Sequence, residues 1–597
     1  MCGIVGYVGG RDASKVVLEG LKILEYRGYD SCGIATYAKG LEVKKDKGMI
    51  DEVDLGQRFL EMKGNVGIGH TRWATHGPPS MENSHPHTDC TGEIAIVHNG
   101  IISNYLELRK SLTDRGHTFT SETDSEVLAH LIEEQHTDMS LEKAVISALG
   151  DVEGSYAILA ISSREPGRII CVRHESPLLL GLGEGECFLG SDISAFLSYT
   201  KQVIPLDDME YALVDQDGWV VKDARTGDVL DKEIMTVSWN QEMAQKEGYP
   251  TFMLKEIHEQ PKTVKDALNV YDKDIEQLAG MIKNAKRTYI IGAGTSLNAA
   301  WVSFYWFARL CRTPVIVMDS SEFLEGGICD ADTLVIGITQ SGETYDTLSA
   351  IRFAKSFDAK TASVVNVIGS TATRESDHVL MQNSGIEISV CATKTFTSQM
   401  VVLLRTALAL GKTLGVNESE LASVEAELTN VPGYIESVFE KKDEIDKAAK
   451  QYFNRKNYLY IGKGISLPTA LEGALKFKEI TYFHAEGMSS GLLKHGTISL
   501  IDDDFVTVAI IPSNGENRSR IISNVQEIKA REGLVIGVVS GEPVEQCDIS
   551  LTAPDCHELI APFPLTVVCQ LLAYFTAVHH NRNVDRPRAL AKSVTVG

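Results

Sequence analysis

The chain has 597 residues, of which 43% are hydrophobic and 23% are charged. These proportions are ordinary for a globular protein, so they exclude general disorder, and the length predicts several domains, of which we expect three. Lys and Arg number 57 against 81 Asp and Glu, which gives a net charge of −24. Such a charge repels phosphate backbones, so we expect no nucleic-acid partner.

The 11 cysteines are scattered along the chain without any CxxC pair. This pattern favours a reducing compartment over a disulfide framework or a structural zinc site, so we expect a cytoplasmic protein without a metal. The N-terminus lacks the basic flank and long apolar core of a signal peptide, and no uninterrupted apolar run approaches about 18 residues. We therefore expect no membrane association.

Cys2 is the first candidate for chemistry along the chain. Removal of Met1 would leave a thiol and a free α-amine on one residue. An α-amine titrates at about 7.7 to 8.0 and a thiol at about 8.5, so the amine is able to act as the base for a cysteine nucleophile. Taken alone, Cys2 is more simply explained as a small apolar residue that opens a buried strand.

Residues 1–238 contain short apolar runs separated by glycine-rich turns, as in GIVGYV, EIAIVHNG and SYAILAIS. Few helical patterns lie between them, which predicts a layered α+β domain. Residues 239–282 are polar with a helical pattern and are expected to form a linker and docking helices. His85 and His87 have a spacing that suits no helical metal site, so we expect them to pack structurally.

Four positions in this first domain offer groups that would hold a small amino acid against a cysteine. Arg72 is a candidate carboxylate clamp and Asp124 a partner for an ammonium group, while Asn99 and Gly100 supply an amide and an unhindered backbone N–H. Each has a plainer explanation as a surface charge, a helix cap or a turn. Together with EYRGYDSCGIA, however, they closely resemble the class II glutamine amidotransferase domain.

That resemblance covers residues 2 to about 235 and implies a four-layer αββα fold of the N-terminal nucleophile hydrolase type. It implies that Cys2 attacks the side-chain amide of glutamine and that Asn99 and Gly100 form the oxyanion hole. The implied glutamine-binding residues are Arg72, Thr75, His76 and Asp124, with Trp73 as the gate of the ammonia route.

From about residue 283 the pattern changes to a repeated order of strand, glycine-rich turn and helix, which is typical of a doubly wound parallel sheet. YIIGAGTSLNAA, beginning at Tyr289, matches YLYIGKGISLPTALEGALK, beginning at Tyr458, so we expect a duplication. We predict two α/β domains, over 283–425 and 450–597, with helices between them.

The loop TQSGET follows the apolar run TLVIGI and brings hydroxyl and backbone N–H groups to the start of a helix. Such a loop suits a sugar phosphate, although an ordinary helix cap explains it equally well. It lacks the G-x-x-x-x-G-K-[ST] pattern, so a nucleotide is not indicated.

The segments GAGTS, ITQSGET, CATKTFTSQ, LEGALKFKE and LAKSVTV resemble the sugar isomerase (SIS, flavodoxin-like) half of the glutamine:fructose-6-phosphate aminotransferase family. The likeness spans nearly the whole chain. It implies conversion of D-fructose 6-phosphate and L-glutamine to D-glucosamine 6-phosphate and L-glutamate, the first step of hexosamine (UDP-N-acetylglucosamine) biosynthesis, without cofactor or metal. It also implies a homodimer through the isomerase domains, with the His495 loop entering the partner's site.

The same resemblance assigns roles in the second half. Lys592 would be the Schiff-base lysine, Glu479 the proton shuttle and His495 the ring-opening group, with Lys476 as a charge partner. From spacing alone, Lys476 and Glu479 indicate a solvated ion-pair face of a helix, and Lys592 a charge on the tail. The implied sugar-phosphate positions are Thr295, Ser296, Thr339, Gln340, Ser341, Thr344, Val390 and Ala392.

Some positions depart from the family pattern. Leu492 stands where an acidic residue is usual and Thr497 where proline is usual, which leaves the turn after His495 less rigid. Two alternatives therefore stay open: an amidotransferase or deglycase for another phosphosugar, and a non-catalytic sugar-phosphate sensor. The further departures are Cys32, Cys391 and Leu467.

Overall fold

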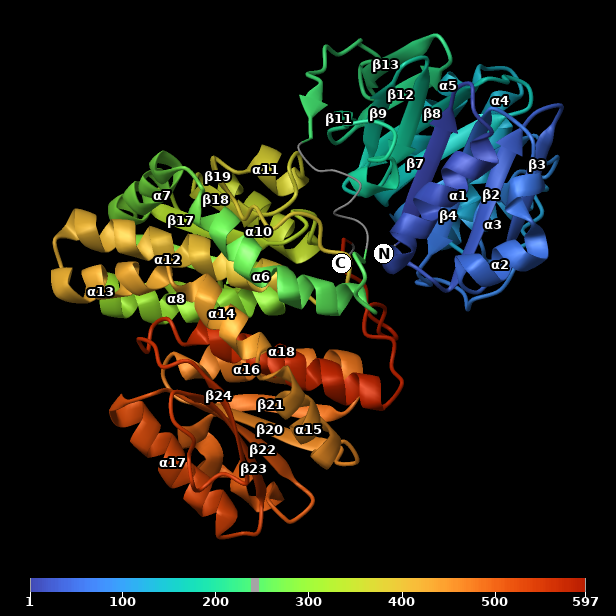
Figure 1. Ribbon diagram of the computed structural model, residues 1–597. Coiled ribbons are helices and arrows are strands. Elements are labelled where there is room, and N and C mark those ends of the chain that lie inside the picture. The colour runs from blue at the N-terminus through green and yellow to red at the C-terminus, as the bar shows by residue number, and fades with distance from the viewer. Residues whose placement is uncertain (1, 238–245, 596–597) are drawn as a thin grey trace.

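The computed structural model describes residues 2–237 and 246–595. Two questions raised by the sequence, the removal of Met1 and the start of the linker at residue 239, lie outside the described residues. Figure 1 shows an N-terminal unit beside a larger body that contains two further α/β units.

Two antiparallel sheets form the N-terminal unit. The strands of the first are β1 (Gly3–Val8), β2 (Ser31–Tyr37), β3 (Leu41–Lys47), β4 (Val66–Arg72), β9 (Leu179–Gly183), β10 (Glu186–Gly190), β11 (Gln202–Pro205) and β14 (Met235–Thr236). Those of the second are β5 (His87–Thr88), β6 (Ile94–Ile102), β7 (Gly154–Ser162), β8 (Arg168–His174), β12 (Glu210–Asp215) and β13 (Gly218–Asp223). Their orders are β14-β11-β9-β10-β1-β4-β2-β3 and β13-β12-β8-β7-β6-β5.

The alternation of side chains along the strands explains the layers, because successive residues of a strand point to opposite faces. In β1, Val5 and Tyr7 pack with helix α1 (Ala13–Leu24), whereas Ile4 and Val8 pack with residues of the second sheet. Residues of β6 divide in the same way between the first sheet and the outer helices α4 (Glu126–His136) and α5 (Leu141–Ala148). The predicted four-layer αββα fold is therefore confirmed.

Each isomerase unit has a five-stranded parallel sheet. The first contains β15 (Arg287–Gly292), β16 (Ile316–Asp319), β17 (Thr333–Thr339), β18 (Lys360–Val365) and β19 (His378–Met381). The second contains β20 (Asn457–Gly462), β21 (His484–Ser489), β22 (Val506–Ile511), β23 (Leu534–Ser540) and β24 (Ile549–Ala553). Both have the strand order 2-1-3-4-5, which is the flavodoxin-like order, so the doubly wound class and the duplication are confirmed.

The two isomerase units share one hydrophobic core. Its main helices are α6 (Phe252–Leu268), α7 (Asp272–Asn284), α8 (Thr295–Cys311), α12 (Lys394–Leu414), α16 (Ser466–Thr481) and α18 (Pro562–His579), joined by α13 (Glu418–Leu428), α14 (Val431–Phe439) and α15 (Lys442–Tyr452). The outer faces carry α10 (Tyr345–Ser356) and α17 (Gly515–Lys529). Helices α6 and α7 lie in the segment expected to form a linker and docking helices, and they pack in this core; the domain bounds stay a prediction.

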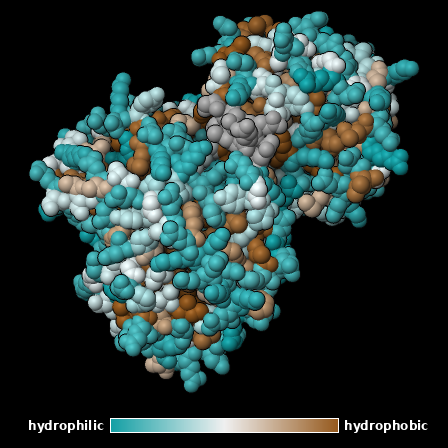
Figure 2. Space-filling model, in the orientation of Figure 1, coloured by the Kyte–Doolittle hydropathy of each residue, from teal (hydrophilic) through white to brown (hydrophobic). Residues whose placement is uncertain are grey.

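Helix α18 is, among the described residues, the one helix that is long and apolar enough to cross a membrane, with a mean hydropathy of 1.3 over 18 residues. Its window is 83% buried inside the protein. A core helix passes the same test of length and composition, so this finding assigns no membrane. The face of the molecule seen in Figure 2 is mostly hydrophilic, with hydrophobic residues in small groups.

The chain after α18 runs back toward the N-terminal unit, where it is drawn in red in Figure 1. The Asp585 carboxylate accepts a bond from the Phe252 backbone N–H at 3.0 Å, and the Asp585 carbonyl accepts one from Val390 at 3.0 Å. Farther along, the Tyr29 hydroxyl donates to the Pro587 carbonyl at 2.9 Å. The tail is therefore bound by both halves of the molecule.

Candidate active sites

Cys2 is half-buried immediately before β1. The Trp73 backbone N–H donates to its Sγ at 3.2 Å. Burial raises the pKa of the Cys2 thiol, and the hydrogen bond from Trp73 opposes that shift. Because only the thiolate is a good nucleophile, this thiol needs a base beside it, a need that a free α-amine on Cys2 would meet.

Asn99, on strand β6, lies next to Cys2, and Gly100 follows it on that strand. Asn99 Nδ2 donates to the Cys2 carbonyl at 3.0 Å, and its Oδ1 lies 3.0 Å from His70 Nε2, which orients the amide N–H groups toward the cysteine. Gly100 has a φ of +131°, and a Cβ there would lie 1.9 Å from the Ser155 carbonyl oxygen, so only glycine fits. Asn99 is thus brought to Cys2 and Gly100 follows it on the same strand, while the oxyanion hole itself stays a prediction.

Arg72, His76 and Asp124 converge beside this strand. Arg72 donates to the His76 carbonyl and, at 3.1 Å, to the Gly77 carbonyl. Its other terminal nitrogen is buried without a partner among the described residues. Asp124 Oδ1 lies 3.8 Å from His76 Nδ1, and Thr75 Oγ1 lies 3.4 Å from the same nitrogen. The group has an unused guanidinium N–H for a carboxylate and a buried carboxylate for an ammonium group.

His85 and His87 lie in a buried histidine cluster. The rings of His70 and His85 stack with their centroids 4.0 Å apart, and His87 Nε2 lies 3.1 Å from Thr123 Oγ1. Burial lowers the pKa values of His85 and His87 far below the usual range, so both rings are neutral. Their contacts are those of packed side chains, as expected.

Lys592 is held in place by the ordered tail. Its Nζ donates to the Glu387 carboxylate and, at 2.8 Å, to the Ser389 carbonyl. The next residue, Ser593, shares a hydrogen bond of 2.8 Å with Ser341. A lysine that resembles a tail charge in the sequence is therefore buried beside the predicted phosphate loop.

The predicted phosphate loop is a tight turn between β17 and α10. The Thr339 and Thr344 hydroxyl oxygens lie 3.0 Å apart, and the Gly342 N–H donates to Thr339 Oγ1 at 3.2 Å. Gly342 has a φ of +71°, and a Cβ there would lie 2.0 Å from Ser370 Oγ. This turn brings residues 340–341 to the N-terminus of α10, where backbone N–H groups favour an anion.

Helix α16 carries the predicted acid–base residues. Lys476 Nζ lies 2.7 Å from Glu479 Oε2 and 3.5 Å from Glu472 Oε1, and it donates to Thr295 Oγ1 at 2.9 Å. The Lys476 and Glu472 side chains are 1% and 0% exposed. The surface-ladder interpretation from spacing is therefore wrong, because α8 covers this face of α16.

Burial raises the pKa of Glu472 to about 7, against the opposing charge of Lys476. The pKa of Lys476 is also raised, because Glu479 and Glu472 together outweigh the effect of its burial. Lys476 therefore stays protonated between the two carboxyl groups, whereas Glu472 is poised to exchange a proton near neutral pH.

The Cys391 loop joins these groups. Burial and the nearby Glu479 carboxylate raise the pKa of the Cys391 thiol, and Lys476 and Lys592 lie close enough to oppose that shift. The predicted pocket residues Val390 and Ala392 flank this cysteine; Val390 is buried and Ala392 half-buried. On the other side, Ser296 follows Thr295 at the start of α8. Its hydroxyl accepts a hydrogen bond from Gln399 Nε2 at 3.1 Å.

His495 is not part of this cluster. It is exposed at the end of the 3₁₀ segment Ser490–His495. Within residues 2–237 and 246–595, no hydrogen bond or ion pair joins His495 to Lys592 or Glu479. A single copy of the chain therefore does not bring together all the predicted sugar-site residues.

A cavity lies at the junction of the N-terminal unit and the isomerase half. Arg27 and Asp192 line it from one side, and Ser341, Glu387 and Lys592 from the other. The Arg27 guanidinium forms a buried ion pair of 2.5 Å with Asp192. Lys592 therefore lines a cavity whose wall is formed partly by the N-terminal unit.

Trp73 links the Cys2 environment to the tail. Its backbone contacts Cys2, and its ring lies edge-on to the Tyr29 ring with centroids 5.8 Å apart. Tyr29 in turn donates to Pro587. The predicted gate residue therefore lies between the cysteine and the segment that carries Lys592.

Two acidic residues near Lys592 were missed by the sequence reasoning. Glu387 binds Lys592 and also accepts from the Thr393 N–H at 2.9 Å. Glu256, on α6, accepts from the backbone N–H groups of Ile388 and Ser389 at 2.5 and 3.1 Å. Burial and the nearby Glu387 raise the pKa of Glu256 to about 8. Neither glutamate stands in a motif, so only the fold reveals its role.

Comparisons with known proteins agree with this arrangement. Family models match a glutamine amidotransferase domain over residues 70–198 and SIS domains over 281–409 and 451–579. The glutamine–fructose-6-phosphate aminotransferase (isomerizing) of Methanococcus maripaludis is 51% identical over 606 residues, covering 100% of both chains. That of Thermococcus kodakarensis is 48% identical over 602 residues, again covering 100% of both.

Among solved structures, the C-terminal domain of glucosamine-fructose-6-phosphate aminotransferase from Francisella tularensis aligns with a TM-score of 0.54 and 33% identity. It covers 57% of this chain and 99% of that chain. The sequence relatives extend the match across the amidotransferase unit and both isomerase units in the same order. With about half of its residues identical over its full length, this chain belongs to the glutamine–fructose-6-phosphate aminotransferase family.

Proposed function

We propose that this protein converts D-fructose 6-phosphate and L-glutamine to D-glucosamine 6-phosphate and L-glutamate. The observation that carries the proposal is the pairing, in one chain, of a Cys2 site with a Lys592 site across a shared junction. The N-terminal half offers the groups needed to release ammonia, and the isomerase half offers those needed to use it. The full-length relatives, named for this reaction, support the same conclusion.

In the first half-reaction, Cys2 Sγ would attack the side-chain amide carbon of glutamine. Ammonia leaves and a thioester remains, which water then hydrolyses to glutamate and the free thiol. The Asn99 amide and the Gly100 N–H would stabilise the oxyanion that develops on attack. Arg72 and Asp124 would hold the carboxylate and ammonium groups of the substrate.

In the second half-reaction, the loop at the start of α10 would bind the phosphate, and the Lys592 amine would attack the C2 carbonyl with loss of water. Ammonia then displaces the lysine from the imine. A base removes a proton from C1 and a proton is returned to C2, while the C1 hydroxyl loses its proton and the imine nitrogen gains one, so C1 becomes an aldehyde and C2 carries the amine. Glu479 would be this base. The Lys476 ammonium, 2.7 Å from its carboxylate, holds the carboxylate in place.

Ammonia would travel between the sites through the junction. Trp73 contacts Cys2 at one end of this route, and the cavity bordered by Arg27 and Asp192 reaches Lys592 at the other. A protected route matters because free ammonia is protonated in water and the ammonium ion is not a nucleophile.

The test supplies the purified protein with fructose 6-phosphate and with glutamine labelled with ¹⁵N at its side-chain amide. Label in glucosamine 6-phosphate is the expected result and requires both half-reactions and the transfer between them. Label found only in free ammonia would support the glutaminase role but reject fructose 6-phosphate as the acceptor. Other sugar phosphates would then be compared as acceptors. Absence of label from both pools would reject the enzyme in favour of a sensor.

We also propose a homodimer in which His495 serves the sugar site of the second copy. The support is that His495 is exposed in the single chain and is flanked by Leu492 and Leu500, which are 55% and 51% exposed. Each of the variants His495→Ala and Lys592→Met should be inactive alone. When they are mixed under conditions of subunit exchange, half of the dimers pair the two variants and regain one complete site, which restores about a quarter of the parent activity. No restoration would contradict the shared site.

We propose a cytoplasmic location as well. All eleven cysteines are free thiols, including the exposed Cys90, which supports a reducing compartment. Fractionation of the native cell, with the protein followed by activity, tests this location; recovery from the extracellular fraction would contradict it.

A further inference from the structure

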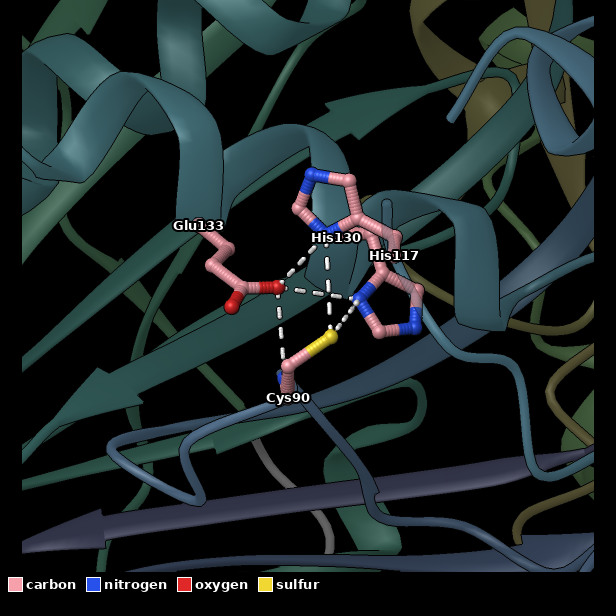
Figure 3. A group of neighbouring side chains, drawn as sticks. All are labelled: Cys90, His117, His130 and Glu133. Atoms are coloured by element: carbon pink, nitrogen blue, oxygen red, sulfur yellow. Dashed lines mark hydrogen bonds and ion pairs between the residues drawn. The ribbon is translucent and has the colours of Figure 1, made fainter. Parts of the chain in front are cut away.

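Four side chains with metal-binding atoms meet on the N-terminal unit, outside the two active sites (Figure 3). They are Cys90, His117, His130 and Glu133, and their ligand atoms all lie within 4.8 Å of one another. Cys90 lies between β5 and β6, and His117 follows α3 (Tyr105–Asp114), while His130 and Glu133 are neighbours on one face of α4. The proposed function uses none of these residues.

The distances to the sulfur atom match a tetrahedral zinc site. With bonds of about 2.3 Å to sulfur and about 2.0 to 2.1 Å to nitrogen, a sulfur and a nitrogen ligand of one zinc ion lie about 3.6 Å apart. Cys90 Sγ lies 3.6 Å from His130 Nδ1 and 3.7 Å from His117 Nδ1. Both imidazole nitrogens thus lie at the distance from the sulfur atom that one zinc ion requires.

The Glu133 carboxylate completes the set at a slightly shorter distance. Its Oε2 lies 2.9 Å from His117 Nδ1 and 3.0 Å from His130 Nδ1, whereas nitrogen and oxygen ligands of a tetrahedral zinc lie about 3.4 Å apart. An ion between them requires the carboxylate to withdraw by about half an ångström. Glu133 is partly exposed, so its side chain has room for this movement.

The groups behind the ligands also suit a metal. A metal-binding histidine usually donates its other ring N–H to a carboxylate. His117 Nε2 lies 3.2 Å from Glu134 Oε1, and His130 Nε2 lies 3.8 Å from Glu126 Oε1. In addition, the Thr118 backbone N–H donates to Cys90 Sγ at 3.5 Å, a contact that stabilises a thiolate. His117 Nε2 thus has a carboxylate partner that leaves its Nδ1 free to coordinate, whereas His130 Nε2 is buried without a hydrogen-bond partner among the described residues.

Hydrogen bonding alone explains this cluster less well. Three donors then share the single oxygen Oε2 of Glu133, namely the two Nδ1 atoms and, at 3.2 Å, the Cys90 N–H. The other oxygen of Glu133 bonds to none of the residues drawn in Figure 3. The Cys90 sulfur meanwhile lies against two ring nitrogens. One central cation satisfies all four groups, because a thiolate, a carboxylate and two neutral imidazoles together balance a charge of +2.

We propose that Cys90, His117, His130 and Glu133 bind one structural Zn²⁺ ion. On binding, the Cys90 thiol releases its proton to solvent as the sulfur–zinc bond forms, and each imidazole coordinates through Nδ1. All four positions belong to protein side chains, which is typical of a structural rather than a catalytic zinc site. The ion fastens the segment after α3 to α4, and that segment leads directly to Asp124 of the glutamine pocket.

The experiment measures zinc in the full-length, tag-free protein after saturation with Zn²⁺ and removal of free metal. We expect about one zinc per chain in the parent protein. Cys90→Ser and His117→Gln should lose it or bind it at least about tenfold more weakly in a chelator competition. The matched control Cys329→Ser, at a half-buried thiol of the isomerase half, should keep it.

Two further measurements separate this site from adventitious metal. Replacement of zinc by Co²⁺ should give a sulfur-to-cobalt charge-transfer band in the parent that is missing in Cys90→Ser. Glu134→Gln should weaken zinc binding by about 10- to 100-fold while leaving the four ligands in place. Because Cys90 is exposed, Cys90→Ser should fold, which circular dichroism checks. A parent protein without zinc, or a folded Cys90→Ser protein that retains a full equivalent, would overturn the proposal.

Discussion

Replacing Glu256 by glutamine should stabilise the isomerase half at neutral and alkaline pH. Glu256 is buried on α6, and burial together with Glu387 raises its pKa from 4.5 to about 8. Between these two pH values the folded protein holds a proton that the unfolded chain has released. The free energy of unfolding therefore falls as pH rises through this window and changes no further above pH 8.

The magnitude follows from the size of this shift. Each pKa unit corresponds to about 1.4 kcal/mol, so the parent protein loses up to about 5 kcal/mol from this one group between about pH 4.5 and pH 8. Glutamine carries no charge, yet its Oε1 still accepts from Ile388 and Ser389 as the carboxyl group of Glu256 does. The variant should match the parent near pH 5 and exceed it increasingly up to pH 8.

Thermal and urea unfolding at pH 5, 6, 7 and 8, at constant ionic strength, measure this difference. Glu276→Gln is the matched control, because Glu276 is an exposed glutamate on the adjacent helix α7. Its curve should stay parallel to that of the parent protein. If the curve of Glu256→Gln also stays parallel, Glu256 is ionised in the folded protein throughout this range and the reasoning fails.

Three further predictions concern the two active sites and their junction. Cys2→Ala should abolish glutamine hydrolysis yet leave fructose 6-phosphate binding unchanged by calorimetry; loss of both would contradict the division of labour between the halves. Gly342→Ala forces a left-handed backbone on alanine at about 1–2 kcal/mol and displaces Ser370, so the KM for fructose 6-phosphate should rise about tenfold. An unchanged KM would exclude this loop from phosphate binding. Asp192→Asn removes the charge that pairs with the buried Arg27 and should cost about 3–5 kcal/mol in unfolding experiments. A change below about 1 kcal/mol would show that the pair is as weak as an exposed one.

Local sequence patterns predicted a layered α+β unit followed by doubly wound α/β units, whereas the four-layer αββα arrangement came from the family resemblance. Short apolar runs between glycine-rich turns identified the strands of the first unit, and the paired segments from Tyr289 and Tyr458 identified the repeated α/β unit. The strand orders themselves required the structure. The relation of Asn99 and Gly100 to Cys2 came instead from the family resemblance, because an Asn-Gly pair alone fits an ordinary turn, whereas both residues lie inside strand β6.

Other features depend on contacts between distant segments, which spacing does not encode. Lys476 and Glu479 have the spacing of an exposed ion-pair face, and only the packing of α8 on α16 buries it. Glu387 has no motif, because its partner Lys592 arrives from the tail. The absence of a CxxC pair likewise led us to expect no metal, whereas Cys90 meets the other ligands of its cluster through three separate segments.

The docking of the tail also sets an order of events during synthesis. The ribosome adds Cys2 long before Lys592, and the tail binds surfaces of both halves. The sugar site is therefore completed only after the earlier units have folded. A chain that is interrupted before Asp585 still carries the whole amidotransferase unit, so it would consume glutamine without making an amino sugar. Transfer of the glutamine nitrogen to a sugar therefore requires that the tail has been synthesised and has docked.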